Sequence, residues 1–242
     1  MHTHRKESRT RLHYVLAVYC CLAVLAAPTS FGRTPEGVVP VSSEPNHKIR
    51  FDNGKVRMYE VFLHKGRGTL FHEHRADIFV VSFLDSEATD EPRGGTPLLF
   101  EVLPGTVGFV STWAGPYSHR VIASKNTEFH VIAMELMSPK PDKAANPNQR
   151  ANPPFRVVSE NRRGRVYRIR LAPGESTGLY TRPASTALFA ISTGRIAEEV
   201  DGKPNRLWDF EPGHFRWMDT SETLLLKNEG GKPVDLVEIE VF

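Results

Sequence analysis

Two histidines separated by one residue stand near the end of a glycine-containing stretch of the sequence. Gly66–Asp77 runs GRGTLFHEHRAD and contains His72 and His74. Side chains two positions apart on a β-strand point to the same face, so the two imidazoles would project together. Histidine is the commonest protein ligand of borderline divalent metals. The pair therefore indicates half of a metal site, which needs at least one more ligand from elsewhere.

The remaining ligands must come from other segments. His119, which follows the turn-rich GPYS, is the candidate third ligand. Asp77 is the nearest carboxylate, three positions beyond His74. On a regular strand Asp77 would face away from both histidines, so it ligates only if the chain turns or bulges at Arg75-Ala76.

Several other side chains near the candidate ligands are considered as pocket-lining or structural residues. Trp113 and Tyr117 flank the turn before His119 and either line the mouth of a pocket or simply pack. His47 lies close to a turn and is expected to be exposed, whereas His130, on a later strand, is expected to be a structural histidine.

The first 26 residues differ from the rest of the chain. They hold a basic stretch, an apolar run and small residues at its end, which is the pattern of a secretory signal peptide, with a signal anchor as the alternative. They also carry four basic residues and one acidic residue, so they account for the whole net charge of +3 and leave a neutral remainder. Both cysteines, Cys20 and Cys21, lie there. We therefore expect a secreted or periplasmic protein without disulfides, without a membrane span after cleavage and without a nucleic-acid partner.

The remainder of the chain consists of short apolar stretches separated by turns. Val56–Leu63 alternates, and 78–84 is almost continuously apolar, as expected of a strand covered on both faces. Long helical periodicity is absent. The sequence predicts an all-β fold of five segments: a signal peptide at 1–26, an arm at 27–48, a barrel at 49–137, a proline-rich linker at 138–160 and a second barrel at 161–242.

The two predicted barrels repeat one another in sequence. Residues 57–66 (RMYEVFLHKG) match 165–174 (RVYRIRLAPG) at an offset of 108. After a Pro-Gly turn in each half the offset becomes 105, as one short deletion would produce. Such self-similarity indicates a duplicated module.

The second copy lacks every candidate ligand of the first. The residues aligned with His72, His74, Asp77 and His119 are Tyr180, Arg182, Ser185 and Leu224. Metal chemistry is therefore expected only in the first barrel, while Tyr180 and Arg182 either form an anion-binding cavity or serve as ordinary structure.

At these residues the chain resembles the cupin superfamily, and its duplication resembles that of a bicupin. The spacing Gly66–His72–His74 fits the first motif of the family, and Gly108 with His119 fits the second. The chain departs from the family where a Glu usually follows the His-x-His pair, because Ile78 and Phe79 stand there. The proline, glycine and asparagine of the second motif are also replaced.

The resemblance implies two tandem jelly-roll barrels, with a divalent metal in the first. Nitrogen and oxygen ligands suit Fe, Mn, Ni, Cu or Zn, and open coordination positions suit catalysis. The resemblance further implies a metal-dependent dioxygenase, or an isomerase or lyase, acting on a small organic molecule. The alternative is a non-catalytic module that binds a metal or a small ligand, and homo-oligomerisation stays open.

Overall fold

The protein was analysed as a computed structural model that describes residues 37–138, 150, 154–200 and 203–242; the predicted signal peptide lies outside these residues. The described residues form strands, with one short 3-10 helix and no α-helix. The first half comprises β1 (Val39–Pro40), η1 (Val41–Ser43), β2 (His47–Asp52), β3 (Val56–Leu63), β4 (His72–His74), β5 (Asp77–Ser82), β6 (Ser86–Pro92), β7 (Leu98–Val102), β8 (Val107–Val110), β9 (Tyr117–Ala123) and β10 (Phe129–Leu136).

The second half follows the same plan. It comprises β11 (Phe155–Asn161), β12 (Gly164–Leu171), β13 (Tyr180–Arg182), β14 (Thr186–Ala190), β15 (Gly194–Val200), β16 (Arg206–Phe210), β17 (Phe215–Met218), β18 (Glu222–Asn228) and β19 (Val234–Val241). Strand β11 starts inside the range predicted as a linker and ends one residue past it, and β1, η1 and the start of β2 lie inside the predicted arm. Each barrel therefore starts earlier than its predicted boundary.

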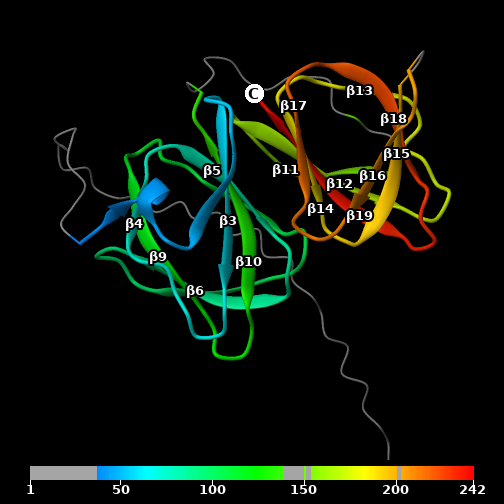
Figure 1. Cartoon of the computed structure of the whole chain (residues 1–242). Helices are drawn as coiled ribbons and strands as arrows, with labels where there is room; N and C mark the ends of the chain where they lie inside the picture. The colour runs from blue at the N-terminus through cyan, green and yellow to red at the C-terminus, as the bar shows by residue number, and fades with distance from the viewer. Residues whose placement is uncertain (1–36, 139–149, 151–153, 201–202) are drawn as a thin grey trace, which may run out of the picture.

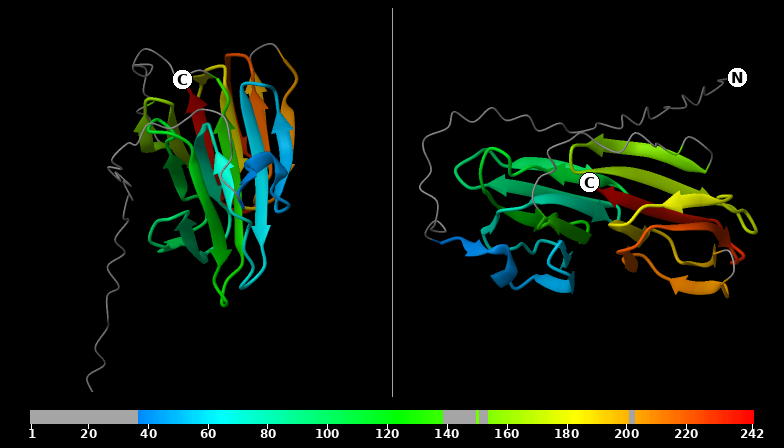
Figure 2. Two further views of the ribbon diagram at one scale, coloured as in Figure 1. Left: turned by 90° about the vertical axis from the view of Figure 1, so that its left-hand side faces the viewer. Right: turned by 90° about the horizontal axis from the view of Figure 1, so that it is seen from above.

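Each half contains two sheets with equivalent strand orders. In the first half the orders are β1-β4-β9-β6-β7 and β2-β3-β10-β5-β8. In the second they are β13-β18-β15-β16 and β11-β12-β19-β14-β17. The predicted duplication and the predicted all-β fold of two jelly-roll barrels are thus confirmed. Figure 1 shows the two barrels side by side, and Figure 2 gives the same arrangement from two further directions.

One of the hydrophobic clusters lies between the barrels. It joins residues of β3, β5 and β10 to residues of β12, β14 and β19, including Met58, Phe79 and Met134 from the first half and Phe189 and Ile239 from the second, all buried. These strands are apolar on both faces because one face covers their own barrel and the other covers the second barrel. The outer sheets, which contain β4 and β9 or β13 and β18, lie away from this shared core (Figure 1). No helix among the described residues is long and apolar enough to cross a membrane.

Candidate metal centre

Strand register brings the three predicted histidines together. In the antiparallel pair β4–β9, His72 lies directly opposite His119, and His74 lies on the same face two residues along. The ring centroids of His72 and His119 are 4.5 Å apart, those of His72 and His74 are 4.9 Å apart, and those of His74 and His119 are 5.3 Å apart. Two short strands thus place three imidazoles inside the first barrel.

A fourth imidazole enters from the facing sheet. His47 begins β2, and its ring centroid is 4.4 Å from that of His72 and 6.2 Å from that of His74. Ring nitrogens of His47, His72 and His74 all lie within 4.8 Å of one another, which is a spacing that can hold a metal ion. His47 is 8% exposed, so the expectation that it would be exposed was wrong. The turn before β2 directs this side chain into the barrel instead of into solvent.

All four imidazoles are oriented in the same way. Each places Nδ1 against an oxygen that can only accept a hydrogen bond, so Nδ1 donates and the lone pair of Nε2 is left free. The acceptors of His47, His72, His74 and His119 are Glu44 Oε2 at 2.7 Å, the Leu70 carbonyl at 2.9 Å, Glu135 Oε1 at 3.1 Å and Asp90 Oδ1 at 2.6 Å. Metal-ligating histidines characteristically donate their second ring N–H to a carboxylate or carbonyl in this way.

Two of the four Nε2 atoms are buried and unsatisfied. Nε2 of His72 and Nε2 of His119 are both inaccessible to solvent and have no hydrogen-bond partner among the described residues. A buried polar atom without a partner is costly, and native proteins rarely retain one without a reason. Two such nitrogens, facing a group of imidazoles, fit the donor set of a bound divalent cation.

Burial favours the neutral form of the His72 and His74 imidazoles, which is the form that metal ligation requires. Loss of solvent lowers the pKa of His72 to about 2, and the three neighbouring imidazoles lower it further. Burial also lowers the pKa of His74, against a hydrogen bond to Glu135 that raises it. Burial alone would raise the pKa of Glu44, but hydrogen bonds from His47 and other donors lower it to about 2. The carboxylate is therefore charged and can orient His47.

Asp77 is placed differently from the histidines. It starts β5, after the break at Arg75-Ala76, and its Oδ1 accepts a hydrogen bond from the Thr112 backbone N–H at 2.7 Å. Its Oδ2 lies 3.2 Å from Nε of Arg163, which belongs to the second half of the chain. The chain does turn at Arg75-Ala76, as ligation by Asp77 would need. The Asp77 carboxylate, however, points to Thr112 and Arg163.

Of the two predicted pocket residues, Tyr117 lies beside His119 and Trp113 lies at the surface. The Tyr117 ring centroid is 4.6 Å from that of His119, and its hydroxyl donates to Oδ2 of Asp90 at 2.6 Å. The Asp90 carboxylate therefore accepts hydrogen bonds from both Tyr117 and His119. Trp113 is 71% exposed and lies at the surface. The His119 side chain is 13% exposed, so this edge is the more open side of the centre.

Sequence reasoning missed His47 and the carboxylates that orient the imidazoles. Two signals were available. Position 47 aligns with Phe155 at the offset of 108, which places it at the start of a repeated strand. Glu135 is a lone carboxylate within an apolar strand, and such a residue is seldom fully buried unless it is paired.

No protein-family model matches the chain, and no curated protein matches it in sequence. Solved structures match it in fold. AerE from Microcystis aeruginosa aligns at a TM-score of 0.61 and 8% identity, over 78% of this chain and 88% of that one. Oxalate decarboxylase from Bacillus subtilis, a protein with Mn(II) centres, aligns at a TM-score of 0.51 and 13% identity, over 77% and 68%. A cupin domain from Bordetella pertussis aligns at a TM-score of 0.34 and 20% identity, over 36% and 91%. With its equivalent pairs of sheets and its group of inward-facing histidines, the chain has the fold of the cupin superfamily, present twice.

Proposed function

We propose that the first barrel binds a divalent metal ion through Nε2 of His47, His72, His74 and His119. The observation that carries this proposal is the common orientation of the four rings, each with Nδ1 fixed by an acceptor. Three of the acceptors are carboxylates, and their charge offsets that of a divalent cation surrounded by neutral ligands. His47 thus takes the place that the sequence offered to Asp77.

The ligand set indicates what such a centre can do. A divalent metal held by four imidazoles keeps open positions when its geometry is octahedral or five-coordinate, and there it polarises a carbonyl or activates oxygen. The protein supplies the orientation of the rings and a largely dry surrounding. At the more open edge, Tyr117 and Asp90 can hold a polar group of a small ligand beside His119.

From this arrangement we propose a metal-dependent enzyme that acts on a small organic molecule, with a dioxygenase as the first choice and an isomerase or lyase as the second. The likeness to AerE and to oxalate decarboxylase supports the fold and does not assign a reaction, because one fold hosts many chemistries. The other candidate is a binding module without turnover. Its support is the burial of His47, His72 and His74, which are at most 8% exposed and leave a ligand little direct access.

Elemental analysis of the purified protein tests the metal centre. We expect one equivalent of a divalent metal in the unaltered chain and a large loss in His47→Ala. The matched control is His130→Ala, because His130 also pairs with a carboxylate, Glu60 at 3.0 Å, but lies outside the group of four. Equal metal content in the His47 and His130 variants would refute the ligand set.

Oxygen consumption separates the two functional candidates. The metal-loaded protein is offered a panel of diols, keto acids and phenols. Uptake that depends on the metal and disappears in His119→Ala supports the enzyme. Stoichiometric metal without turnover on the panel, or on substrates of an isomerase or lyase, supports the binding module.

Export is proposed on the sequence pattern of residues 1–26 and on the lack of cysteine in the rest of the chain. N-terminal sequencing of the protein recovered from the periplasm or the medium is expected to begin near residue 27. Recovery of the uncleaved chain with membranes would support a signal anchor instead.

A further inference from the structure

The second barrel keeps the geometry of the metal centre while changing its residues. In the first barrel the rings of His47 and Tyr59 are 5.7 Å apart at an interplanar angle of 77°. The residues 108 positions later, Phe155 and Tyr167, are 5.7 Å apart at 77°. The aromatic pair is therefore reproduced, with an apolar ring where the first barrel has an imidazole.

A third ring completes the correspondence. Tyr180 aligns with His72, and its ring centroid is 4.7 Å from that of Phe155, compared with 4.4 Å between His72 and His47. Tyr180 also lies opposite Leu224, just as His72 lies opposite His119. The space that faces the metal ligands in the first barrel is thus bounded by three aromatic rings in the second.

A cation already lies in this space. The guanidinium carbon of Arg150 is 4.1 Å from the ring centroid of Tyr167, 4.5 Å from that of Phe155 and 4.8 Å from that of Tyr180. All three distances are within the range of a cation–π interaction. Nε and Nη1 of Arg150 are buried without hydrogen-bond partners among the described residues, as expected for atoms that meet ring faces.

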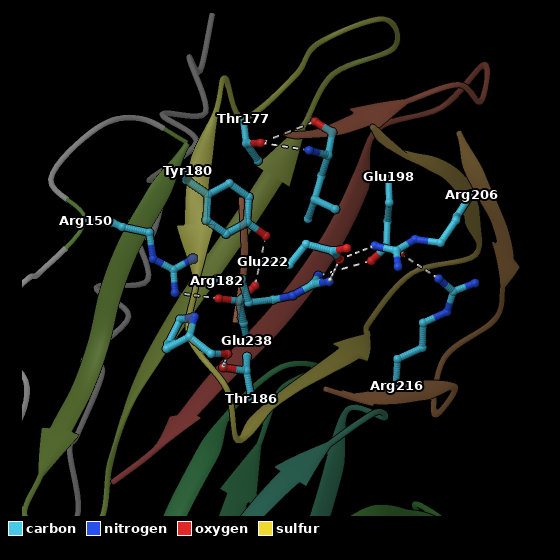
Figure 3. Close-up of polar contacts among 12 residues, drawn as sticks. Arg150, Thr177, Tyr180, Arg182, Thr186, Glu198, Arg206, Arg216, Glu222 and Glu238 are labelled. Atoms are coloured by element: carbon cyan, nitrogen blue, oxygen red, sulfur yellow. Dashed lines mark hydrogen bonds and ion pairs between the residues drawn. The ribbon is translucent and has the colours of Figure 1, made fainter. Parts of the chain in front are cut away.

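Two buried carboxylates complete the surroundings of the cation. Nη2 of Arg150 donates to Glu238 at 2.5 Å and also to Glu240. The side chains of both acids are at most 4% exposed, and the Tyr180 hydroxyl donates to Glu238 at 3.2 Å. Figure 3 shows Arg150 and Tyr180 converging on Glu238. A buried carboxylate is costly unless it is paired, so these acids require a cation.

Two further charged side chains of the barrel, Arg182 and Glu198, are paired with each other. Arg182, which aligns with His74, donates to Glu198 at 3.1 Å, and Glu198 also accepts from Arg216 at 3.0 Å (Figure 3). Arg182 is therefore engaged with a carboxylate, which argues against the anion-binding cavity considered from the sequence. Acidic groups and ring faces together are complementary to a planar cation.

We propose that the second barrel is a guanidinium-binding site whose resident ligand is the side chain of Arg150, an internal cation at the position that corresponds to the metal in the first barrel. The site is formed by Phe155, Tyr167, Tyr180, Glu238 and Glu240. When the Arg150 side chain is shortened, this site accepts a free alkylguanidinium ion. The comparison with the metal position rests on the proposed function, whereas the contacts of Arg150 with the three rings and two acids do not depend on it.

The test is chemical rescue of Arg150→Ala in the full mature chain. Removing the cation leaves Glu238 without its ion-pair partner and Glu240 with only the longer contact to Arg165 at 3.7 Å, so the Tm should fall by about 5–15 °C. Millimolar methylguanidinium chloride should restore much of this loss with a saturable concentration dependence, since a ligand that binds only the native state stabilises it. The same concentration of NaCl should not restore it. Metal content should be unchanged, which keeps this result separate from the proposal for the first barrel.

Two further variants control the experiment. Arg195→Ala removes an exposed arginine that pairs with Asp209, and we expect neither a loss of Tm nor a response to methylguanidinium. Arg150→Ala with Glu238→Gln should lose the rescue. If Arg150→Ala does not fold alone, refolding in methylguanidinium should recover soluble protein. An unchanged Tm in Arg150→Ala, an equal effect of NaCl, or failure to recover the protein with methylguanidinium would overturn the proposal.

Discussion

The carboxylate of Asp77 and the guanidinium of Arg163 form an ion pair across the two halves of the chain, with Oδ2 and Nε 3.2 Å apart. Both side chains are at most 5% exposed. Arg163 also donates to the backbone carbonyl of Ser138 at 2.9 Å. The residue that the sequence offered as a fourth metal ligand therefore connects the first barrel to the second.

Asp77→Asn is expected to lower stability and to leave metal content unchanged. The amide keeps the shape of the side chain but removes the charge opposite Arg163, and breaking a buried ion pair typically costs about 3–5 kcal/mol. Denaturant unfolding together with elemental analysis measures both quantities. Asp209→Asn, which alters an exposed pair with Arg195, is the matched control and should have little effect. Loss of metal in Asp77→Asn with native stability would restore Asp77 as a ligand.

His74→Ala is expected to abolish metal binding while the chain still folds, because stability comes chiefly from apolar burial. The matched control is the aligned position of the second barrel, where Arg182→Met should leave the metal content as it is. Circular dichroism establishes folding, and elemental analysis gives the metal content. Retention of metal by the His74 variant and its loss from the Arg182 variant would show that the active half had been assigned wrongly.

Glu135→Gln should weaken metal binding without removing a ligand. Glu135 accepts the Nδ1 proton of His74 and makes that imidazole a better donor, and loss of such a partner typically lowers metal affinity about 10–100-fold. Competition with a chelator measures the affinity. Glu240→Gln, at the aligned position of the second barrel, is the control that should leave it unchanged.

The metal-free protein should lose stability as the pH falls below about 6.5. In the unfolded chain the imidazole of His72 takes up a proton near its ordinary pKa of 6.5, whereas in the folded chain its pKa is lowered to about 2. The unfolded state therefore binds more protons between these values, and stability falls by about 1.4 kcal/mol per pH unit for this one group. Thermal unfolding of chelator-treated protein from pH 7.5 to 5 measures the slope. His72→Leu should give a shallower one; identical slopes would contradict the assignment.

The residues that sequence reasoning identified share a local signal. His72 and His74 were predicted to face together because strand side chains alternate, and the structure places both inside the first barrel. The duplication was visible in the sequence because corresponding strands of the two halves keep the same apolar pattern. It also predicted correctly that Tyr180 would take the position of His72, as the register opposite Leu224 shows.

What the sequence did not show depends on contacts between distant segments. Asp77 is directed by Arg163, which is 86 positions away and in the other barrel, so no local pattern shows the pairing. His47 enters from the facing sheet, and the local alternation of its strand does not show which residues of the other sheet it meets. Arg150 stands in a proline-rich stretch whose composition indicates a linker, although its partly buried side chain packs against three rings.

The shared apolar layer between the barrels explains why a copy without metal ligands is kept. Residues such as Phe79 and Phe189 are inaccessible and belong to a cluster to which both halves contribute. Either half produced alone would expose a wide apolar sheet to water and would be prone to aggregate. The second barrel therefore protects the apolar face of the first barrel from water. It stays necessary for this reason, although it has none of the first barrel's metal ligands.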